Sequence, residues 1–436
     1  MRIYEAFPCE LSYLQIQAMN KVYIDSNGCA VLRHETERIA RYFILNGWIL
    51  EKSPEVADIV ILTCCGVTHN EEDEAIGMLR KLEEIRTPDS RIIVSGCMPA
   101  FAKERVLDVS PQATILKYAE LVQLDGIISA DVPFETVYYN VHPQLESENN
   151  SEYDTDMNLQ LMRKIDRLCG SRMCEQAWNV STLRKYMWDD NKTFQIKVSY
   201  GCPGKCSYCA TKIGIGDFRS VDKDFIMMQF SEGLKMGYDH FILMGDEIGA
   251  YGRDIGTTLP ELLQQMYDKS DGKATVSIRY IHPDILVTLY DRMKKFFALG
   301  FVNYFCCAIQ SASPTVLMRM NRNPNIEPFI RCMEDINKNN YPVSKHTQII
   351  VGFPGEISDD VLLTMDALRR CEFEHININL YSPRQHTAAW NMKETVTQEE
   401  KIFRAELIRH SMKLYKKALL YLSLIHISEP TRLLSI

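Results

Sequence analysis

Three cysteines in one short run, Cys202, Cys206 and Cys209, constrain the chemistry of this chain more than any other feature. Their C-x3-C-x2-C spacing places three thiolates on one loop, and no His or Cys follows closely to complete a set of four. A structural zinc ion requires four ligands, so zinc fits this pattern poorly. Three thiolates can hold an iron–sulfur cubane and leave one iron open to a small molecule. The alternative, three buried structural cysteines, is less common at this density in a chain that is not secreted.

The composition is typical of a large intracellular enzyme. The chain has 436 residues, of which 46% are hydrophobic, and this length suffices for two or more domains. The sequence shows neither the apolar core of a signal peptide nor an apolar stretch long enough to span a bilayer, which predicts a cytoplasmic protein with no membrane partner. Its 14 cysteines then indicate thiolate chemistry instead of disulfides. The net charge of -8 predicts no overall attraction to nucleic acid, although it does not exclude a local basic face.

A second set of cysteines follows strand-like runs near the N-terminus. Residues 21–24, 58–63 and 91–95 are short, β-branched, apolar runs of the kind that form buried parallel strands. Helical periodicity over 32–43, and a helix capped by Asn70 with an acidic first turn, predict the connections between these strands. The cysteines that follow the runs are Cys29, the pair Cys64 and Cys65, and Cys97.

These cysteines are expected to converge, because the carboxyl ends of parallel strands meet at one edge of an open α/β sheet. Convergence predicts a second site with three thiolates. Three separately buried cysteines remain the alternative on these residues alone, since free cysteine is among the most buried residue types.

A three-cysteine α/β domain followed by a C-x3-C-x2-C domain resembles the radical S-adenosylmethionine (SAM) methylthiotransferases, which modify tRNA adenosines or a ribosomal protein. The resemblance covers nearly all of residues 21–421. It rests on these segments in their common order: Tyr208 before the third cysteine, Cys307-Ala-Ile-Gln310-Ser-Ala-Ser313, Met320-Asn-Arg322, Ile350-Val-Gly352-Phe-Pro-Gly355-Glu356 and Tyr381-Ser-Pro-Arg384. Two departures from the family pattern are Ala312 in place of glycine and Cys64 in place of threonine.

The resemblance implies an α/β fold in which an N-terminal three-layer parallel-sheet domain precedes a partial (β/α)6 radical SAM barrel. The expected barrel strands are 194–199, 240–244, 277–282, 304–310 and 347–352. The expected parts are an N-terminal extension (1–20), the three-layer domain (21–112), a linker or insertion (113–195), the radical SAM domain with its C-terminal helix (196–421), and a tail (422–436). The tail resembles a translated sequencing adaptor, so we expect the parent protein to continue after Tyr421 with the small β-barrel that relatives carry.

Two 4Fe-4S clusters and SAM are the cofactors that the resemblance implies. The C-x3-C-x2-C loop would hold the cluster that cleaves SAM, with a flavodoxin-like protein as electron donor. Cys29, Cys65 and Cys97 would hold an auxiliary cluster that supplies sulfur, and Cys64 is the alternative ligand to Cys65.

Residues for a SAM pocket can be proposed from the ligand's chemistry, because its ammonium needs acceptors and its carboxylate needs a donor. Asp246 and Glu247 could accept from the ammonium, although a solvated acidic turn is an equal alternative. Arg279 or Arg384 could bind the carboxylate or form barrel ion pairs. Gly352 is expected in a tight turn that lets the backbone approach the adenine. The full predicted set is Tyr208, Asp246, Glu247, Arg279, Gln310, Gly352 and Arg384.

The implied function is insertion of a methylthio group at an unactivated C–H of a modified tRNA adenosine. The first alternative is a protein or peptide substrate, which the acidic balance favours. The others are a radical SAM reaction whose second cluster only transfers electrons, and a non-enzymatic iron–sulfur regulatory or binding module. Cys169 and Cys174 form a C-x4-C pair without further ligands nearby. Residues 146–156 are expected to be a solvated linker or a surface loop. His282 precedes Pro283, a position that is more often structural than catalytic, and it is assigned no role.

Overall fold

The computed structural model describes residues 20–28, 30–66, 69–137 and 193–428. The chain divides into two units, residues 1–146 with 210–216, and residues 147–209 with 217–436. Three predicted features lie outside the described residues: the proposed ligand Cys29, the pair Cys169 and Cys174, and the acidic stretch 146–156.

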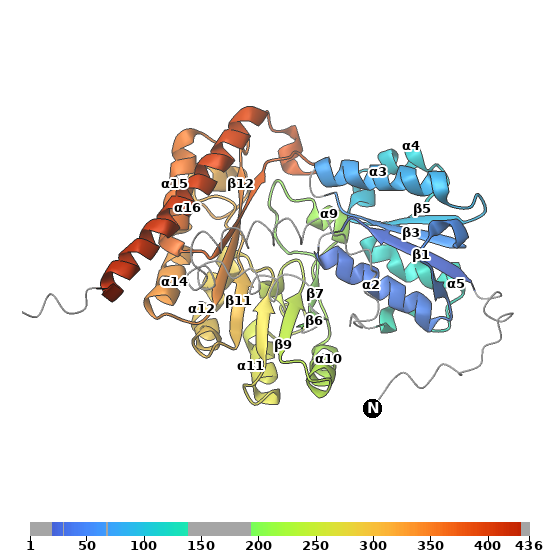
Figure 1. Cartoon of the computed structure of the whole chain (residues 1–436), viewed down its shortest axis with the longest axis horizontal. Helices are drawn as coiled ribbons and strands as arrows, with labels where there is room; N and C mark the ends of the chain where they lie inside the picture. The colour runs from blue at the N-terminus through green and yellow to red at the C-terminus, as the bar shows by residue number, and fades with distance from the viewer. Residues whose placement is uncertain (1–19, 29, 67–68, 138–192, 429–436) are drawn as a thin grey trace, which may run out of the picture. The chain divides into compact units, whose positions relative to one another are not determined.

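The N-terminal unit contains a five-stranded parallel sheet in the order β2-β1-β3-β4-β5 (Figure 1). Its strands are β1 (Lys21–Ser26), β2 (Ile49–Leu50), β3 (Ile59–Cys64), β4 (Arg91–Gly96) and β5 (Thr114–Lys117). Its α-helices are α2 (Ala30–Leu45), α3 (His69–Ile85), α4 (Lys103–Val109), α5 (Leu124–Ile128) and α9 (Thr211–Ile215). Short 3-10 helices are η1 (Pro54–Val56), η2 (Met98–Ala100), η3 (Tyr118–Gln123) and η4 (Phe134–Thr136).

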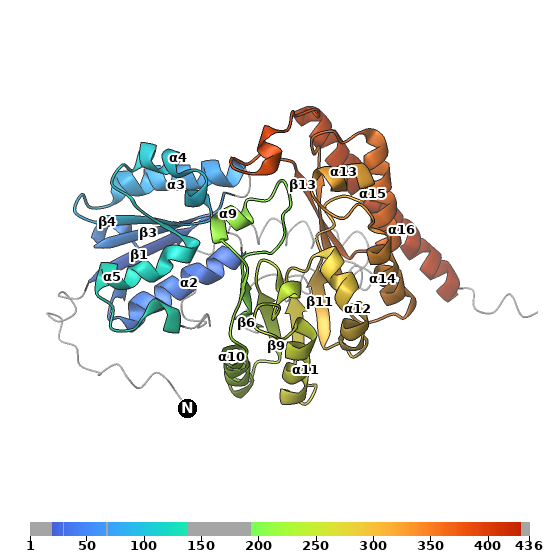
Figure 2. The same cartoon turned by 180° about the vertical axis from the view of Figure 1, so that it is seen from behind.

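The two faces of this sheet carry separate apolar layers, because neighbouring side chains on a strand point in opposite directions. On β3, Val60 and Leu62 pack in the layer that α3 and α4 cover, whereas Ile59 and Ile61 pack in the layer that α2 covers. Figure 2 shows α3 and α4 on one face and α2 and α5 on the other. Every residue of β3 is buried, as expected for a parallel strand covered on both sides. The predicted three-layer domain is confirmed.

Two details differ from the sequence-based expectation. The N-terminal unit extends past residue 112, where we placed its end, since β5 pairs with β4. Within β5 only Leu116 is buried, so the strand carries little of the apolar pattern that marks its neighbours. Asn70 does not cap α3, because the helix begins at His69 and Asn70 lies inside its first turn; the acidic residues Glu71 and Glu72 in that turn are confirmed.

The second unit contains a six-stranded parallel sheet in the order β13-β12-β11-β10-β9-β6, with a small antiparallel pair, β7 and β8. Its strands are β6 (Thr193–Lys197), β7 (Ser199–Tyr200), β8 (Arg219–Ser220), β9 (His240–Met244), β10 (Thr275–Ile278), β11 (Val302–Cys306), β12 (Ser344–Val351) and β13 (His375–Leu380). Its helices are α10 (Lys223–Lys235), η6 (Ile248–Ala250), α11 (Leu259–Lys269), α12 (Pro283–Ala298), α13 (Pro314–Arg319), α14 (Glu327–Lys338), α15 (Ser358–Cys371), η7 (Ala388–Asn391) and α16 (Gln398–Ser428).

These six strands alternate with helices and confirm the predicted partial barrel. In the described part of the chain no pairing joins β6 to β13, so the barrel is open. β10 ends at Ile278, four residues before the predicted end, because the chain turns there to begin α12. α16 continues to Ser428, past Tyr421, and the adaptor origin of residues 422–436 stays a prediction. Among the described helices, none combines the length and apolar character needed to cross a bilayer.

Candidate active site

The C-x3-C-x2-C loop follows β7 and is anchored to the end of β9 and to the segment after α13. At its start, the Gly201 N–H donates to Asp246 Oδ2 at 2.9 Å, just after β9. Farther along, the Ser207 N–H donates to the Met320 carbonyl at 2.9 Å, in the segment after α13. The barrel strands therefore present the three cysteines at their carboxyl ends, where functional residues of such barrels lie.

The segment after α13 also supplies contacts that the sequence did not reveal. Asn321 adopts a left-handed φ of 55°, which asparagine tolerates, and its Nδ2 donates to the Lys205 carbonyl at 2.7 Å. Arg322 follows, with Nη1 at 3.6 Å from Cys206 Sγ and 3.3 Å from the Tyr208 hydroxyl. The Met-Asn-Arg motif marked these residues as family-like, but their contact with the cysteine loop depends on tertiary folding across 116 residues.

The three thiols suit a cubane better than a single metal ion. Among the described residues, no three His, Cys, Asp or Glu side chains are gathered closely enough for one ion. Thiolates of a cubane bind different irons, so they lie farther apart than the ligands of one ion. Cys202, Cys206 and Cys209 are all partly exposed. Burial raises the pKa of Cys202 to about 12, opposed by the Gly204 N–H, and coordination to iron would remove this proton.

The turn after β9 contains the two acidic residues proposed for SAM. Glu247 is only 4% exposed, and its Oε1 accepts from the N–H groups of Gly249 at 3.1 Å and His282 at 3.2 Å. Burial raises the pKa of Glu247 to about 7, and burial likewise raises the pKa of Asp246. The alternative of a solvated acidic turn is therefore wrong for Glu247. Contact of either carboxylate with SAM stays a prediction.

We expect Glu247→Gln to change how the stability of the cluster-free protein depends on pH. The folded protein holds the Glu247 proton up to a pKa of about 7, whereas the unfolded chain releases it near the ordinary glutamate pKa of 4.5. The folded state thus binds more protons between these values, and this group's contribution to stability falls as pH rises through that window. Above pH 7 the loss approaches about 3 kcal/mol at most. Chemical denaturation of both proteins across this range would reveal it, and a stability difference independent of pH would contradict the assignment.

Gln310, after β11, has the features of a ligand-binding residue. Its backbone is held at a left-handed φ of 66° by hydrogen bonds to the Gln348 carbonyl and from the Ile350 N–H, each 2.9 Å long. Its Oε1 is buried and has no hydrogen-bond partner among the described residues. A strained backbone and an unsatisfied acceptor are typical of binding sites, so Gln310 suits the N–H and O–H donors of SAM.

The predicted tight turn at Gly352 is confirmed. Gly352 has a φ of 77°, and a Cβ there would lie 2.2 Å from the Cγ of Lys401. Its N–H donates to Glu356 Oε1 at 2.8 Å, which closes the turn. Only glycine allows the backbone at position 352 to lie so close to the Lys401 side chain. Next to this turn, the ring of Phe353 packs edge-on against Tyr208, with their centroids 6.3 Å apart.

The two arginines proposed for the SAM carboxylate are both buried, with 6% exposure for Arg279 and 3% for Arg384. The charge of Arg279 acts to lower the pKa of Cys306 and of His346, so the guanidinium lies near these two buried residues of β11 and β12. Arg384 Nη2 donates to the Ser382 hydroxyl at 3.3 Å. Whether either residue binds SAM is a prediction that these contacts do not test.

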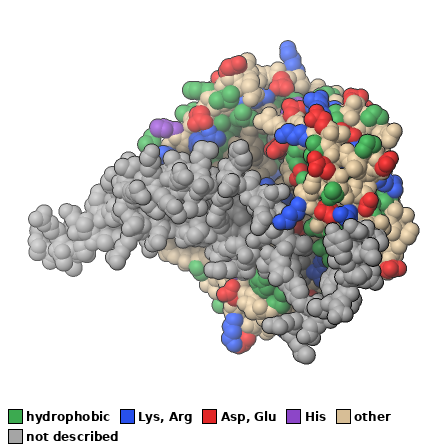
Figure 3. All heavy atoms as spheres, turned by 45° about the vertical axis from the view of Figure 1, so that its right-hand side comes forward, with side chains coloured by type: hydrophobic (Ala, Val, Ile, Leu, Met, Phe, Trp, Pro, Cys, Tyr) green, Lys and Arg blue, Asp and Glu red, His purple; other side chains and the backbone are tan. Residues whose placement is uncertain are grey.

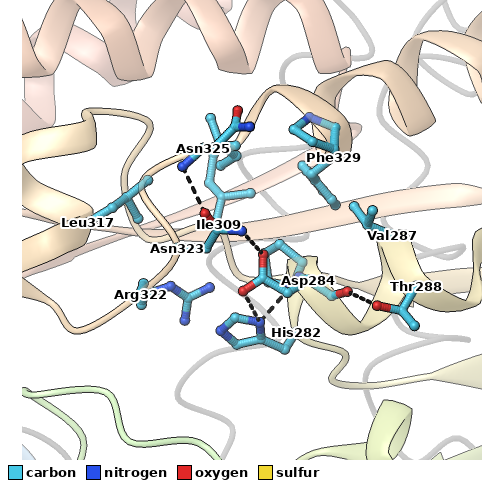
Figure 4. A pocket seen from close by; sticks show the side chains of 13 residues that line it. His282, Asp284, Val287, Thr288, Ile309, Leu317, Arg322, Asn323, Asn325 and Phe329 are labelled. Carbon is cyan, nitrogen blue, oxygen red and sulfur yellow. Dashed lines mark hydrogen bonds and ion pairs between the residues drawn. The ribbon is translucent and has the colours of Figure 1, made fainter.

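A cavity of about 210 Å³ lies between the start of α12 and the segment after α13 (Figure 4). Figure 4 shows Arg322 and His282 on one side of it, and Asn323 Nδ2 donates to Asp284 Oδ1 at 3.1 Å. His282 Nδ1 accepts from the Asp284 N–H at 3.3 Å and caps α12. The apolar lining consists of Pro283, Val287, Ile309, Leu317, Ile326, Pro328 and Phe329.

In the N-terminal unit, the ends of β3 and β4 bring Cys65 and Cys97, the described members of the proposed auxiliary set, to one sheet edge. The Cys97 N–H donates to the Cys64 carbonyl at 3.1 Å. Gly96 makes this contact feasible, since a Cβ at its φ of 103° would lie 2.5 Å from the Cys64 oxygen. The Cys65 N–H donates at 2.8 Å to the side-chain oxygen of Asn27, which follows β1. Cys65 and Cys97 therefore meet at the edge that the parallel sheet predicts.

Packing, and not exposure, distinguishes the two candidates for the middle ligand, because both are buried, with 1% exposure for Cys64 and 3% for Cys65. Cys64 packs with Val60 and Leu62 in the apolar layer under α3. Cys65 lies past the end of β3 and outside that apolar layer. This placement favours Cys65 as the ligand.

We expect Cys64→Ala to retain the auxiliary cluster and to lose about 1 kcal/mol of stability, because it removes a buried sulfur from the core. Iron analysis and thermal unfolding of the variant would measure both effects. Loss of the auxiliary cluster in Cys64→Ala, with retention in Cys65→Ala, would reverse the assignment.

Comparison with known proteins agrees with this geometry. The family described as "Radical SAM superfamily" matches residues 196–368, and "Uncharacterized protein family UPF0004" matches residues 21–117. The tRNA-2-methylthio-N(6)-dimethylallyladenosine synthase of Thermotoga petrophila is 25% identical over 90% of this chain and 82% of its own. The threonylcarbamoyladenosine tRNA methylthiotransferase MtaB of Thermotoga maritima is 26% identical over 91% of this chain and 82% of its own.

Among solved structures, the radical S-adenosylmethionine methyltransferase TsrM from Kitasatospora setae has a TM-score of 0.54 and 11% identity, over 85% of this chain and 77% of that one. This likeness concerns the fold alone. The two matched domains stand in the same order as the two cysteine sets, and relatives align across both. The chain belongs to the radical SAM methylthiotransferase family.

Proposed function

We propose that this enzyme replaces a hydrogen atom of a modified tRNA adenosine with a methylthio group. One observation carries the proposal: the chain holds two separate sets of cysteines at strand ends. One set follows β6 and β7 of the barrel, and the other follows β3 and β4 of the N-terminal sheet. An enzyme that both generates a radical and donates sulfur needs two such centres.

Family membership implies one 4Fe-4S cluster and SAM, and the second cluster is part of our proposal. When bound, the first cluster and SAM supply a 5′-deoxyadenosyl radical that removes a hydrogen atom from an unactivated carbon. Cys202, Cys206 and Cys209 would hold this cluster, and an electron donor of the flavodoxin type would reduce it. Gln310 would orient SAM through its unsatisfied Oε1, and the Asp246 turn through its carboxylates and backbone.

The N-terminal cysteines would hold the sulfur-donating centre. Cys65 and Cys97 lie at one edge of the sheet, and Cys29 would complete the set. The buried β3 and β4 fix the first two positions, so the thiolates do not depend on a mobile loop for their spacing. This rigidity is what a cluster site with three ligands requires.

The substrate is assigned from the relatives named above, both of which act on tRNA according to their names. The charge distribution of the chain does not by itself distinguish tRNA from a protein substrate. On the face seen in Figure 3, the described Lys and Arg side chains are interspersed with Asp and Glu instead of forming one basic field. The net charge of -8 also keeps a protein or peptide substrate as the second candidate.

Expression in a bacterial host that lacks its own tRNA methylthiotransferase would test the substrate. We expect methylthiolated adenosine to reappear in digested tRNA with the intact chain and not with Cys202→Ala. If tRNA nucleosides stay unchanged while a host protein gains one methylthio group, the substrate is a protein. If neither changes, the proposed transfer reaction is wrong.

A further inference from the structure

We propose that Arg322 raises the reduction potential of the cluster on the C-x3-C-x2-C loop by holding its guanidinium against the Cys206 sulfur. Arg322 acts here as a positioning and tuning residue, because its contact is to a ligand atom and not to a reacting atom. The inference rests on the proposed cluster at this loop, and the experiment below separates the failure of the two.

The structure fixes the guanidinium from both sides. Nη1 lies 3.6 Å from Cys206 Sγ, a hydrogen-bond distance for the larger sulfur atom, while Nη2 donates to the Ala308 carbonyl at 2.8 Å. The Arg322 N–H also donates to the Leu317 carbonyl at 2.8 Å, and the left-handed turn at Asn321 directs the chain toward the loop. The side chain is thus pre-organised, which makes its contact with sulfur specific.

The chemistry of its partners points to an anionic sulfur. The hydrogen-bond acceptors of the guanidinium among the described residues are the Cys206 sulfur, the Tyr208 hydroxyl and the Ala308 carbonyl. The Ala308 carbonyl is neutral, whereas the Cys206 sulfur becomes a thiolate when it binds iron, so it can provide a negative charge in direct contact. A partly buried arginine is stabilised by such a partner, and a cluster thiolate supplies it.

Three further ionisable groups interact with Arg322 at longer range, namely Glu247, His282 and the buried thiol of Cys307. Its charge acts on Glu247, which is held by backbone donors, and on His282, whose pKa burial lowers to about 3. His282 is therefore neutral at physiological pH and does not compete for the sulfur. Glu247 partly offsets the field of Arg322, but it makes no hydrogen bond to the guanidinium in the described structure.

The sign of the effect follows from charge. Reduction adds one negative charge to the cluster, and a nearby cation stabilises the more negative state. Hydrogen bonds to cluster sulfurs act in the same direction. Arg322 should therefore make the cluster easier to reduce, which favours the electron transfer that begins SAM cleavage.

The test is an EPR-monitored redox titration of the reconstituted protein without SAM, in a Cys65→Ala, Cys97→Ala background that leaves one cluster. Arg322→Gln is expected to shift the midpoint potential to a lower value. Arg322→Lys should give an intermediate value, because it keeps the charge but loses the planar two-sided contact. Arg319→Gln is the matched control, since the Arg319 guanidinium donates to the Pro354 carbonyl and does not contact the loop sulfurs.

An unchanged potential in Arg322→Gln would overturn the proposal, and so would an equal fall in Arg319→Gln. If the Arg322→Gln protein does not bind a cluster, the Arg322→Lys protein provides the test. A midpoint potential lower than that of the protein with Arg322 supports the proposal, and an equal midpoint potential refutes it. Absence of any cluster in the background protein would instead refute the cluster assignment itself.

Discussion

Replacing Cys202, Cys206 and Cys209 together by alanine is expected to remove about half of the iron, from about eight to about four atoms per chain, and to abolish SAM cleavage. The physical reason is that these residues are the protein ligands proposed for the cluster with an open iron, and SAM needs that iron. The loop is anchored by backbone hydrogen bonds from Gly201 and Ser207, so alanine should leave the fold intact. Iron analysis and detection of 5′-deoxyadenosine after anaerobic reduction would measure both losses.

Cys306→Ala is a matched control for this experiment, because Cys306 is a buried barrel cysteine outside the loop. It should retain all of the iron, although it costs stability by leaving a small cavity in the barrel. Formation of 5′-deoxyadenosine by the triple variant would show that radical chemistry occurs elsewhere.

Replacing Cys29, Cys65 and Cys97 is expected to have the complementary effect. About four irons should remain, and reductive cleavage of SAM should persist, whereas transfer of the methylthio group should stop. The reason is that Cys65 and Cys97 follow strands of a different sheet from the one before the radical site, so the loss of sulfur donation need not disturb that site. The measurement pairs 5′-deoxyadenosine with the methylthiolated product in one anaerobic reaction.

The outcome for SAM cleavage discriminates between two roles of the N-terminal cysteines. Retained cleavage without sulfur transfer fits a donor centre. Cleavage that stops in parallel with sulfur transfer would contradict it, and would favour an electron-transfer role for the second cluster.

The sequence predicted those parts of the fold that are buried on both faces. The runs at 21–24, 58–63 and 91–95 became β1, β3 and β4, because a parallel strand covered by helices must be apolar throughout. The sequence did not predict β5, because this strand buries only Leu116 and therefore lacks a continuous apolar run. The residue type of Asn70 and the acidic residues after it predict a cap, but residue type alone does not fix the first residue of a helix, and α3 begins one residue earlier.

The sequence predicted those parts of the candidate site that local motifs identify. The C-x3-C-x2-C spacing identifies the cysteine loop, and the turn at Gly352 follows from its glycine. Contacts between distant segments were not predictable: neither Arg322 against Cys206 nor the two backbone donors to Glu247 leave a signal in local sequence. The family-like run favours Cys65 over Cys64 as the ligand, and the strand adds that Cys64 packs in the apolar layer.

One measurement tests the central claim most directly: mass spectrometry of tRNA after anaerobic incubation with the reconstituted protein, SAM and a reductant. We expect an adenosine in which one hydrogen is replaced by a methylthio group, formed together with 5′-deoxyadenosine and absent when Cys202→Ala replaces the intact protein. Steady formation of 5′-deoxyadenosine with no methylthiolated adenosine in any tRNA would contradict the assignment of this chain as a tRNA methylthiotransferase.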